Sequence, residues 1–275
     1  MQFNEAQIQA IQHNTGPCMV IAGPGSGKTT VLTHRVRYLI ERYGVNPSDI
    51  LVITFTKAAA EQMKLKFKGL SEGRNSAVTF GTFHAVFFTI LKAAYNYSAH
   101  CIIKPQIQHE FVKDQMCRLE LEYDDENEAV AGVLSEISCV KGEDVNIDEY
   151  ESRCIPPQSF RIMYRAYDDM LVRKHLIDFD DMIVQCRELL MQREDYRRAW
   201  QNKYKYILID EFQDINKAQF DVVRILADEY RNLFVVGDDD QSIYGFRGSA
   251  PQIMLDFNKY YSCLLYTSPS PRDRG

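Results

Sequence analysis

The sequence predicts an α/β fold, in which a parallel β-sheet is covered by helices on both faces and interrupted by a mainly helical insertion. Short apolar runs of strand length alternate along the chain with segments of helical periodicity. This alternation is typical of parallel strands that are buried on both faces and joined by crossover helices. Between residues 92 and 175 the continuous apolar runs disappear and acidic clusters such as residues 120–126 appear. Helices with a solvated acidic face explain that change.

The expected elements follow from local patterns. Asn4 and Gln7 have the spacing of a capping box, which predicts a helix over residues 4–12 with Asn4 as its N-cap. Apolar runs predict strands at 18–21, 50–53, 77–80, 206–209 and 233–236. Helices are predicted over 29–43, 57–67, 181–190 and 217–230, and one more opens at Gly81. We therefore divide the chain into a first core segment (1–91), an inserted helical subdomain (92–175), a second core segment (176–262) and a C-terminal tail (263–275).

Composition narrows the functional classes. The chain has 275 residues, of which 45% are hydrophobic, and a net charge of −6. No stretch approaches the roughly 20 apolar residues of a membrane span, and the N-terminus lacks the basic and apolar regions of a signal peptide. The seven cysteines are scattered without a C-x-x-C pair, so neither a zinc site nor a disulfide framework is indicated and a cytoplasmic location is expected. The negative net charge of the chain does not indicate nucleic-acid binding, although a local basic groove can still bind a polyanion.

A phosphate-binding loop is the strongest local motif. Residues 22–29 read Ala-Gly-Pro-Gly-Ser-Gly-Lys-Thr, between an apolar run and a helical segment. Strand, glycine-rich turn, Gly-Lys-Thr and helix form the order that a P-loop requires, with Ala22 where the simplest pattern has its first glycine. A flexible turn that happens to carry a lysine is the alternative. The expected nucleotide-binding residues of this segment are Ala22, Gly23, Pro24, Gly25, Ser26, Gly27, Lys28, Thr29 and Thr30.

An acidic pair completes the predicted nucleotide site. Asp210 and Glu211 follow the apolar run at 206–209, which is a Walker B arrangement. Asp210 would hold Mg²⁺ beside the Thr29 hydroxyl, and Lys28 would reach the β- and γ-phosphates. Glu211 would orient or deprotonate an attacking water, which favours hydrolysis over transfer to a substrate. Because parallel sheets bind ligands at the carboxyl ends of their strands, we expect one edge to gather Ala22, Thr54, Thr82, Asp210 and Asp238.

These two motifs lie within or near longer characteristic sequence segments. Residues 210–214 read Asp-Glu-Phe-Gln-Asp, and residues 236–248 read Val-Gly-Asp-Asp-Asp-Gln-Ser-Ile-Tyr-Gly-Phe-Arg-Gly. They resemble motifs II and III of superfamily 1 DNA helicases of the UvrD/Rep/PcrA type. Residues 54–59 resemble motif Ia, without the asparagine that many members carry before the lysine, and residues 81–84 resemble motif Ib. Residues 3–7 resemble the adenine-recognising Q motif, and residues 177–182 a segment where the family's helical insertion rejoins its core.

The resemblance implies a RecA-like core fold with ATP and Mg²⁺ as cofactors. Gln7 would hydrogen-bond adenine, a role that can coexist with capping the first helix. Gln241 would sense the γ-phosphate, and a turn-stabilising amide is the alternative. Together with Lys28, Asp210 and Glu211, Gln241 forms the expected catalytic set.

The resemblance also implies a groove for single-stranded DNA. Phe55, Tyr244 and Phe246 match aromatics that stack on or border the bases, and stacking suits a motor that reads no sequence. Many family members carry Trp at the position of Phe246, and Phe55 can equally belong to the core. The remaining DNA-binding residues that we expect are polar or basic: Thr56, Thr82, His84 and Arg247.

Two of these polar residues would contact the DNA backbone, namely Thr82 and His84. His84 can equally be a packed histidine at the start of a helix. Arg247 would link motif III to the DNA groove.

The implied function is ATP-driven 3′-to-5′ movement on single-stranded DNA. Expected partners are single-stranded DNA, its junctions with duplex, and proteins of repair or replication. The family's second core domain, which supplies arginine fingers, is not found before Cys263, so we expect weak ATP binding and little DNA-stimulated hydrolysis or unwinding by this chain. Two alternatives stay open: a nucleotide-gated DNA-binding module without motor activity, and the ATPase part of a helicase–nuclease subunit.

The tail requires a separate interpretation. Residues from Cys263 onward have no periodicity and join abruptly to a helical segment. They can be back-translated into a sequence that resembles a transposase adapter used in preparing sequencing libraries. We hypothesise that the tail is adapter read-through and exclude it from fold reasoning, and a genuine Ser/Pro-rich linker is the alternative. Resequencing the parent locus decides, because a native gene that continues with the same codons would contradict the adapter hypothesis.

Overall fold

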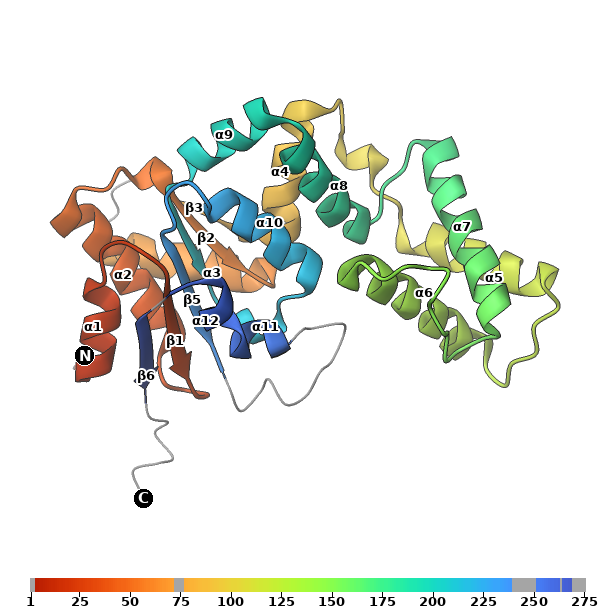
Figure 1. Cartoon of the computed structure of the whole chain (residues 1–275), viewed down its shortest axis with the longest axis horizontal. Coiled ribbons are helices and arrows are strands. Elements are labelled where there is room, and N and C mark those ends of the chain that lie inside the picture. The colour runs from red at the N-terminus through yellow and green to blue at the C-terminus, as the bar shows by residue number, and fades with distance from the viewer. Residues whose placement is uncertain (1–2, 72–76, 239–250, 263, 269–275) are drawn as a thin grey trace, which may run out of the picture.

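The fold is built on one parallel sheet. We describe a computed structural model of the chain, which covers residues 3–71, 77–238, 251–262 and 264–268. Its six strands have the order β3-β2-β4-β5-β1-β6, and all their pairings are parallel (Figure 1). The strands are β1 (Cys18–Ala22), β2 (Ile50–Thr54), β3 (Thr79–Thr82), β4 (Tyr206–Ile209), β5 (Leu233–Gly237) and β6 (Leu264–Ser268). The predicted α/β class is confirmed.

Helices cover both faces of this sheet. One face carries α1 (Glu5–Gln12), α2 (Lys28–Tyr43) and α3 (Lys57–Leu70). The other carries α4 (Phe83–Ala94), α8 (Phe179–Gln192), α9 (Glu194–Lys203) and α10 (Lys217–Ala227). Along β2, Ile50 and Val52 face the first group while Leu51 and Ile53 face the second, as the two-residue period of a strand requires.

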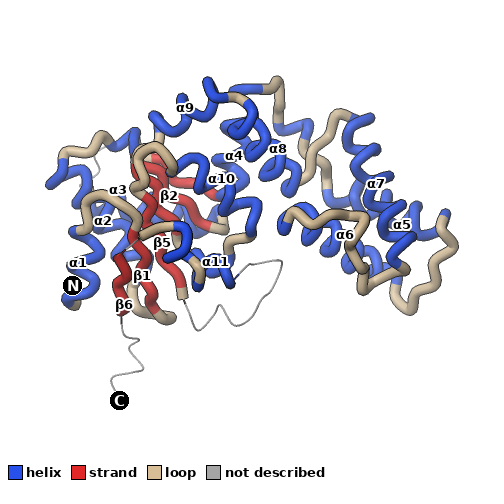
Figure 2. Tube along the Cα trace, viewed as in Figure 1, coloured by secondary structure: helices blue, strands red, loops and turns tan. Residues whose placement is uncertain are grey.

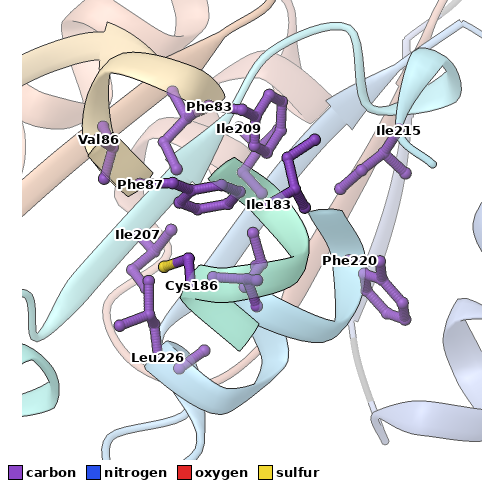
Figure 3. Packing of buried hydrophobic residues seen from close by; sticks show 14 of the residues in the cluster. Phe83, Val86, Phe87, Ile183, Cys186, Ile207, Ile209, Ile215, Phe220 and Leu226 are labelled. Atoms are coloured by element: carbon purple, nitrogen blue, oxygen red, sulfur yellow. The ribbon is translucent and has the colours of Figure 1, made fainter. Parts of the chain in front are cut away.

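The core beneath α4, α8 and α10 is closely packed. Phe87 of α4 and Cys186 of α8 lie against Ile207 of β4, and all three side chains are buried (Figure 3). Two short helices, α11 (Pro251–Leu255) and α12 (Phe257–Tyr260), complete this face, where Phe257 packs edge-on against Phe212. This packing joins α11 and α12 to the apolar cluster that also contains β4 and β5.

A helical lobe interrupts the sheet domain. It contains α5 (Pro105–Arg118), α6 (Glu126–Glu143) and α7 (Pro157–Lys174), which lie together away from the strands (Figure 2). These helices share their own apolar cluster, which includes Val133, Phe160 and Tyr167. The chain enters and leaves the lobe side by side, since Ile103 N donates to Ile177 O at 2.9 Å. The predicted boundary at residue 92 falls inside α4, and the one at residue 175 falls at the C-cap of α7, so the exact division into domains stays a prediction.

Some boundaries differ from those expected. β3 lies two residues later than predicted, because its pairing with β2 continues to Thr54 opposite Thr82. The helix predicted over 217–230 ends at Ala227, and α9 was not expected because only Trp200 and Gln201 of that helix are buried.

The segment that we had excluded from fold reasoning forms β6. It pairs with β1 from Cys18 opposite Leu264 to Ala22 opposite Ser268. Main-chain pairing at an open sheet edge can accept an extended segment of many sequences. The pairing therefore leaves the origin of the tail a hypothesis.

Candidate functional site

Two glycines shape the loop between β1 and α2. Gly25 and Gly27 have φ angles of 74° and 85°, a left-handed conformation that residues with a Cβ rarely adopt. Gly27 is the N-cap of α2 and supplies no side-chain hydrogen bond to the helix. The start of α2 therefore offers an anion its backbone amides and the positive end of the helix dipole. Ser26 Oγ is buried in this loop without a hydrogen-bond partner.

Lys28, the first residue of α2, lies between two carboxylates. Its Nζ is 3.1 Å from Asp238 Oδ2 and 3.4 Å from Glu211 Oε2. Asp238 is fully buried, whereas 41% of the Glu211 side chain is exposed. The two acids follow β5 and β4, so the parallel sheet brings three distant segments together at one edge. This is the edge that the sequence predicted.

Asp210 presents a buried carboxylate next to Thr29. Its side chain is hydrogen-bonded to Thr29, but its Oδ1 is buried and has no hydrogen-bond partner. Burial, reinforced by the charge of Glu211, raises the pKa of Asp210 to about 6, although a hydrogen bond from the Glu211 backbone, the charge of Lys28 and the hydrogen bond to Thr29 oppose this shift. A carboxylate oxygen without a partner beside a hydroxyl is a donor set that Mg²⁺ accepts. The residues therefore fit the metal that the sequence implies.

The protein supplies few ligands of its own to such a metal. In the part of the chain that the structure describes, no group of three or more His, Cys, Asp or Glu side chains is placed to hold a metal ion. Mg²⁺ in nucleotide sites usually takes one or two carboxylates, with waters and phosphate oxygens as its other ligands. One carboxylate and one hydroxyl match that pattern.

Glu211 is held in an unusual backbone conformation. Its φ of 52° and ψ of 46° are left-handed, which costs about 1–2 kcal/mol for a residue with a Cβ. Gln213, which is only 2% exposed, donates from Nε2 to Glu211 Oε2 at 2.9 Å and accepts from Asp238 N at 3.0 Å. A Cβ on Gly237 would lie 3.2 Å from Gln213 Oε1 and 3.0 Å from Met254 Sδ, so any other residue here would push these neighbours by a few tenths of an ångström. One buried amide thus fixes the ends of β4 and β5 relative to each other.

Gln7 connects α1 to the phosphate-binding loop. The predicted capping box is present, since Gln7 N donates to Asn4 Oδ1 at 2.8 Å and Asn4 N donates to Gln7 Oε1 at 3.0 Å. Gln7 Nε2 also donates to Ser26 O at 2.9 Å. The Gln7 amide oxygen can accept a second hydrogen bond, and its nitrogen can donate a second one. Contact with adenine is therefore compatible with this geometry and stays a prediction.

Thr30 is also placed at the loop, on the first turn of α2. Its Oγ1 accepts a hydrogen bond from Lys66 Nζ of α3 at 2.6 Å. An additional cation therefore lies beside the predicted nucleotide site, and the role of Thr30 in binding stays a prediction.

The predicted DNA-binding threonines cap the helices that follow two neighbouring strands, β2 and β3. Thr56 Oγ1 accepts from Ala59 N at 3.1 Å and caps α3, while Thr82 Oγ1 accepts from Ala85 N at 3.3 Å and caps α4. The hydroxyl proton of each can still be donated to a phosphate. Because β2 and β3 are paired up to their last residues, both threonines lie at the same edge as the nucleotide site.

Two rings among the predicted DNA contacts are partly packed. Phe55 is half-buried and meets Phe83 edge-on, with ring centroids 5.0 Å apart. His84 meets Phe179 edge-on at 5.2 Å, and burial lowers its pKa although Asp178 opposes this shift. A neutral His84 would contact DNA by hydrogen bonding rather than by charge. The other predicted contacts, Tyr244, Phe246 and Arg247, lie outside the described residues, as does Gln241.

Comparisons with known proteins agree on one family. The profile of the UvrD/REP helicase N-terminal domain matches residues 3–262. The chain belongs to this helicase family. YjcD of Bacillus subtilis (strain 168) is 37% identical over 94% of the chain. The ATP-dependent DNA helicase PcrA of Staphylococcus epidermidis and that of Staphylococcus aureus (strain Mu50 / ATCC 700699) are each 34% identical over 94% of the chain.

The chain is much shorter than these members of the UvrD/REP family. It spans 35% of the length of YjcD and 36% of each PcrA protein. Among the described residues, no helix is both long and apolar enough to cross a membrane.

Three residues near the site, Gln213, Lys66 and Phe179, were not singled out from the sequence of this family member, and Asp238 was expected at the edge but not as a partner of Lys28. Gln213 lies inside the segment that resembles motif II, and Phe179 lies inside the segment 177–182, so both segments carried an available signal. Lys66 had no such signal, because a lysine on a helix is common. Only the structure shows that Lys66 reaches Thr30 and that Phe179, at 52% exposure, lies beside His84.

Proposed function

We propose that the chain is the ATP-binding half of an ATP-dependent DNA helicase, in which ATP hydrolysis drives movement along single-stranded DNA. The observation that carries this proposal is the partnerless Oδ1 of Asp210, buried beside Thr29 at the edge where Lys28 meets Glu211 and Asp238. The relatives named ATP-dependent DNA helicases support it. Because the chain spans about a third of their length, the second half of such a motor would come from sequence outside this chain.

Each residue of the nucleotide site has a distinct proposed role. Lys28 would exchange part of its contact with Glu211 and Asp238 for the β- and γ-phosphates of ATP. Thr29 and Asp210 would hold Mg²⁺, which neutralises phosphate charge when bound. Glu211 would accept a proton from the attacking water, and its exposed carboxylate is accessible to that water.

The remaining residues of the loop and Gln7 would complete the ATP site. Gly23, Gly25 and Gly27 would allow backbone amides to approach phosphate oxygens, while Gln7 would select adenine. We assign Gln241 to sensing of the γ-phosphate on the basis of the motif alone. Together these roles would connect ATP hydrolysis to the neighbouring DNA-facing edge.

The edge formed by the starts of α3 and α4 would bind single-stranded DNA and its junctions with duplex. Hydroxyls at Thr56 and Thr82 and a neutral imidazole at His84 suit contacts to the sugar-phosphate backbone, which carry no sequence information. Phe55 and the exposed Phe179 would border the bases, as stacking tolerates any sequence. Tyr244, Phe246 and Arg247 belong to the same proposed surface, and proteins of repair or replication are its proposed partners.

Titration with a fluorescent ADP analogue tests the nucleotide site directly. The purified chain should bind the analogue in a Mg²⁺-dependent manner, and Lys28→Ala should weaken binding by tenfold or more, about the loss of one charge-assisted contact. Lys57→Ala is the matched control, because 90% of the Lys57 side chain is exposed on α3. Equal binding by the Lys28 and Lys57 variants would contradict the site.

Catalysis by the isolated chain is a separate test. Arginine fingers in related NTPases contribute about 10³–10⁵ in rate, so DNA-stimulated hydrolysis and unwinding should be almost absent. Robust unwinding by this chain would contradict the proposal that it is half of a motor.

A further inference from the structure

Lys141 of α6 is a buried cation shared by three carboxylates. Its Nζ lies 3.1 Å from Asp168 Oδ1, 3.0 Å from Asp178 Oδ2 and 2.7 Å from Asp181 Oδ1. Only 5% of the Lys141 side chain is exposed. Asp168 belongs to α7, whereas the other two acids lie at the start of α8. One ammonium group therefore joins two helices of the inserted lobe to a helix that packs on the sheet.

An aromatic residue extends this network to a fourth helix. The Tyr167 ring lies 5.3 Å from Lys141 Nζ, within the range of a cation–π contact. The Tyr167 hydroxyl accepts from Gln108 Nε2 of α5 at 2.6 Å and is also hydrogen-bonded to Asp178. All three helices of the lobe thus meet the first turn of α8 through one connected group of polar side chains.

Negative charge exceeds positive charge in this network. Asp180, which is hydrogen-bonded to Ser138, adds a fourth carboxylate, and of the four acids Asp178 is the fully buried one. Burial, reinforced by Asp178, raises the pKa of both Asp180 and Asp181 to about 6. Burial opposes the charge of Lys141, but the surrounding carboxylates outweigh it and raise the lysine pKa. Removing this one cation would leave buried carboxylates without their partner, which is strongly unfavourable.

The first turn of α8 connects the network to the DNA-facing edge. Asp178 Oδ1 accepts from Asp181 N at 2.7 Å, so the acids that bind Lys141 also form the capping box of α8. Phe179 lies within this same turn, and its ring meets His84 at the start of α4. His84 follows Thr82 by two residues. The orientation of this turn therefore sets where Phe179 and His84 lie on the proposed DNA surface.

We propose that Lys141 is a positioning residue for DNA binding, which fixes the helical lobe to the first turn of α8. The inference rests on the proposed DNA-binding function. Two backbone hydrogen bonds join the segments that enter and leave the lobe, from Ile103 N to Ile177 O and from Ile177 N to Cys101 O. The lobe also packs on α8 and α10 through α6, and the shared lysine anchors that packing to the first turn of α8. The lobe and the edge then present a single surface to the DNA strand.

A second ion pair, at the end of α6, provides a matched control. Asp144, the C-cap of α6, accepts from both terminal nitrogens of Arg187 in α8 at 3.0 Å. It connects the same two helices as Lys141. Asparagine suits the left-handed backbone of this cap, Arg187 keeps its contact with Asp221 at 3.7 Å, and the Lys141 network is untouched, so Asp144→Asn should leave the position of the lobe unchanged.

The test compares the unaltered chain with Lys141→Met and Asp144→Asn by hydrogen–deuterium exchange and by two titrations. The titrations use a fluorescein-labelled oligo-dT strand and a fluorescent ADP analogue with Mg²⁺. For Lys141→Met we expect faster exchange at residues 176–184, with unchanged protection of β1 and β5. Oligo-dT affinity should fall about tenfold, a typical coupling between distant sites, while affinity for the ADP analogue stays within about twofold. Asp144→Asn should match the unaltered chain in all three measurements.

Several results would overturn the inference. Equal oligo-dT binding by Lys141→Met and the unaltered chain would do so, as would equal losses of DNA and nucleotide affinity. If Lys141→Met does not fold, Asp168→Asn decides, because it releases α7 and keeps the lysine paired with Asp178 and Asp181. That variant must weaken oligo-dT binding without weakening nucleotide binding. Absence of oligo-dT binding by the unaltered chain would instead contradict the proposed DNA-binding function itself.

Discussion

Replacing Asp210 with asparagine should stabilise the metal-free chain at neutral pH. Burial raises the pKa of Asp210 from 3.8 to about 6 in the folded state. At about 1.36 kcal/mol for each pKa unit, this difference corresponds to about 3 kcal/mol. Asparagine has nearly the same size and can still accept a hydrogen bond from Thr29, but it carries no charge to bury.

The sign and the pH range follow from proton linkage. Below the unfolded pKa of 3.8 both states are protonated and the carboxyl costs nothing. As the pH rises toward 6, Asp210 ionises in the unfolded state before it does so in the folded state, so the free energy of unfolding falls. Above pH 6 the full loss of unfolding free energy remains. The stability gained by Asp210→Asn should therefore be close to zero near about pH 4 and reach at most about 3 kcal/mol at about pH 7.5.

Urea unfolding in the presence of a metal chelator measures this gain at both pH values. Glu61→Gln is the control, because 64% of the Glu61 side chain is exposed on α3 and little charge is buried there. Addition of Mg²⁺ with nucleotide should stabilise the unaltered chain and should have a much smaller effect on Asp210→Asn. A variant that is less stable than the unaltered chain at neutral pH, or whose gain is the same at both pH values, would refute the reasoning.

Three further substitutions test other parts of the structure. Gln213→Leu removes the acceptor of the buried Asp238 N–H and should lower the free energy of unfolding by about 1–3 kcal/mol, measured in urea; an unchanged value would contradict the bridging role. Phe160→Ala empties part of the lobe core at a cost of about 3–5 kcal/mol, so hydrogen exchange should accelerate in α5–α7 and not in β1. Lys66→Ala should weaken binding of a fluorescent ADP analogue by about twofold to fivefold. Lys64→Ala, which changes another exposed lysine of the same helix, should leave this binding unchanged.

The sheet and the ends of its strands could be predicted because both depend on local pattern. A parallel strand buried on two faces is a continuous apolar run, and β2 and β4 show such runs without interruption. The glycines of the loop and the capping box at Asn4 and Gln7 are equally local, and the structure contains both. Parallel topology then places all the strand ends at one edge, so the approach of Lys28 to Glu211 followed from the fold class.

Side-chain pairs between distant segments could not be predicted in the same way. The sequence placed Asp238 at the same edge as the loop, but nothing near Lys28 or Asp238, which are 210 residues apart, specifies that these two side chains pair. The pairing of Lys141 with Asp178 depends on how α6 docks against α8, which is decided by the packing of the whole lobe. Likewise, Gln213 resembles any polar residue after a strand until its two hydrogen bonds are known.

The two lysine clusters differ in a way that separates a ligand site from a structural one. In each cluster an almost fully buried lysine, Lys28 or Lys141, is surrounded by more carboxylates than its single charge can neutralise. At Lys141 the acids find neutral partners in Tyr167, Ser138 and the α8 backbone, and none of their buried oxygens in the described structure is left without a hydrogen bond. At the phosphate-binding loop, Asp210 keeps an oxygen that no protein group satisfies. Excess charge that is fully hydrogen-bonded fixes an orientation, whereas excess charge with an unused ligand atom is suited to a metal and its nucleotide.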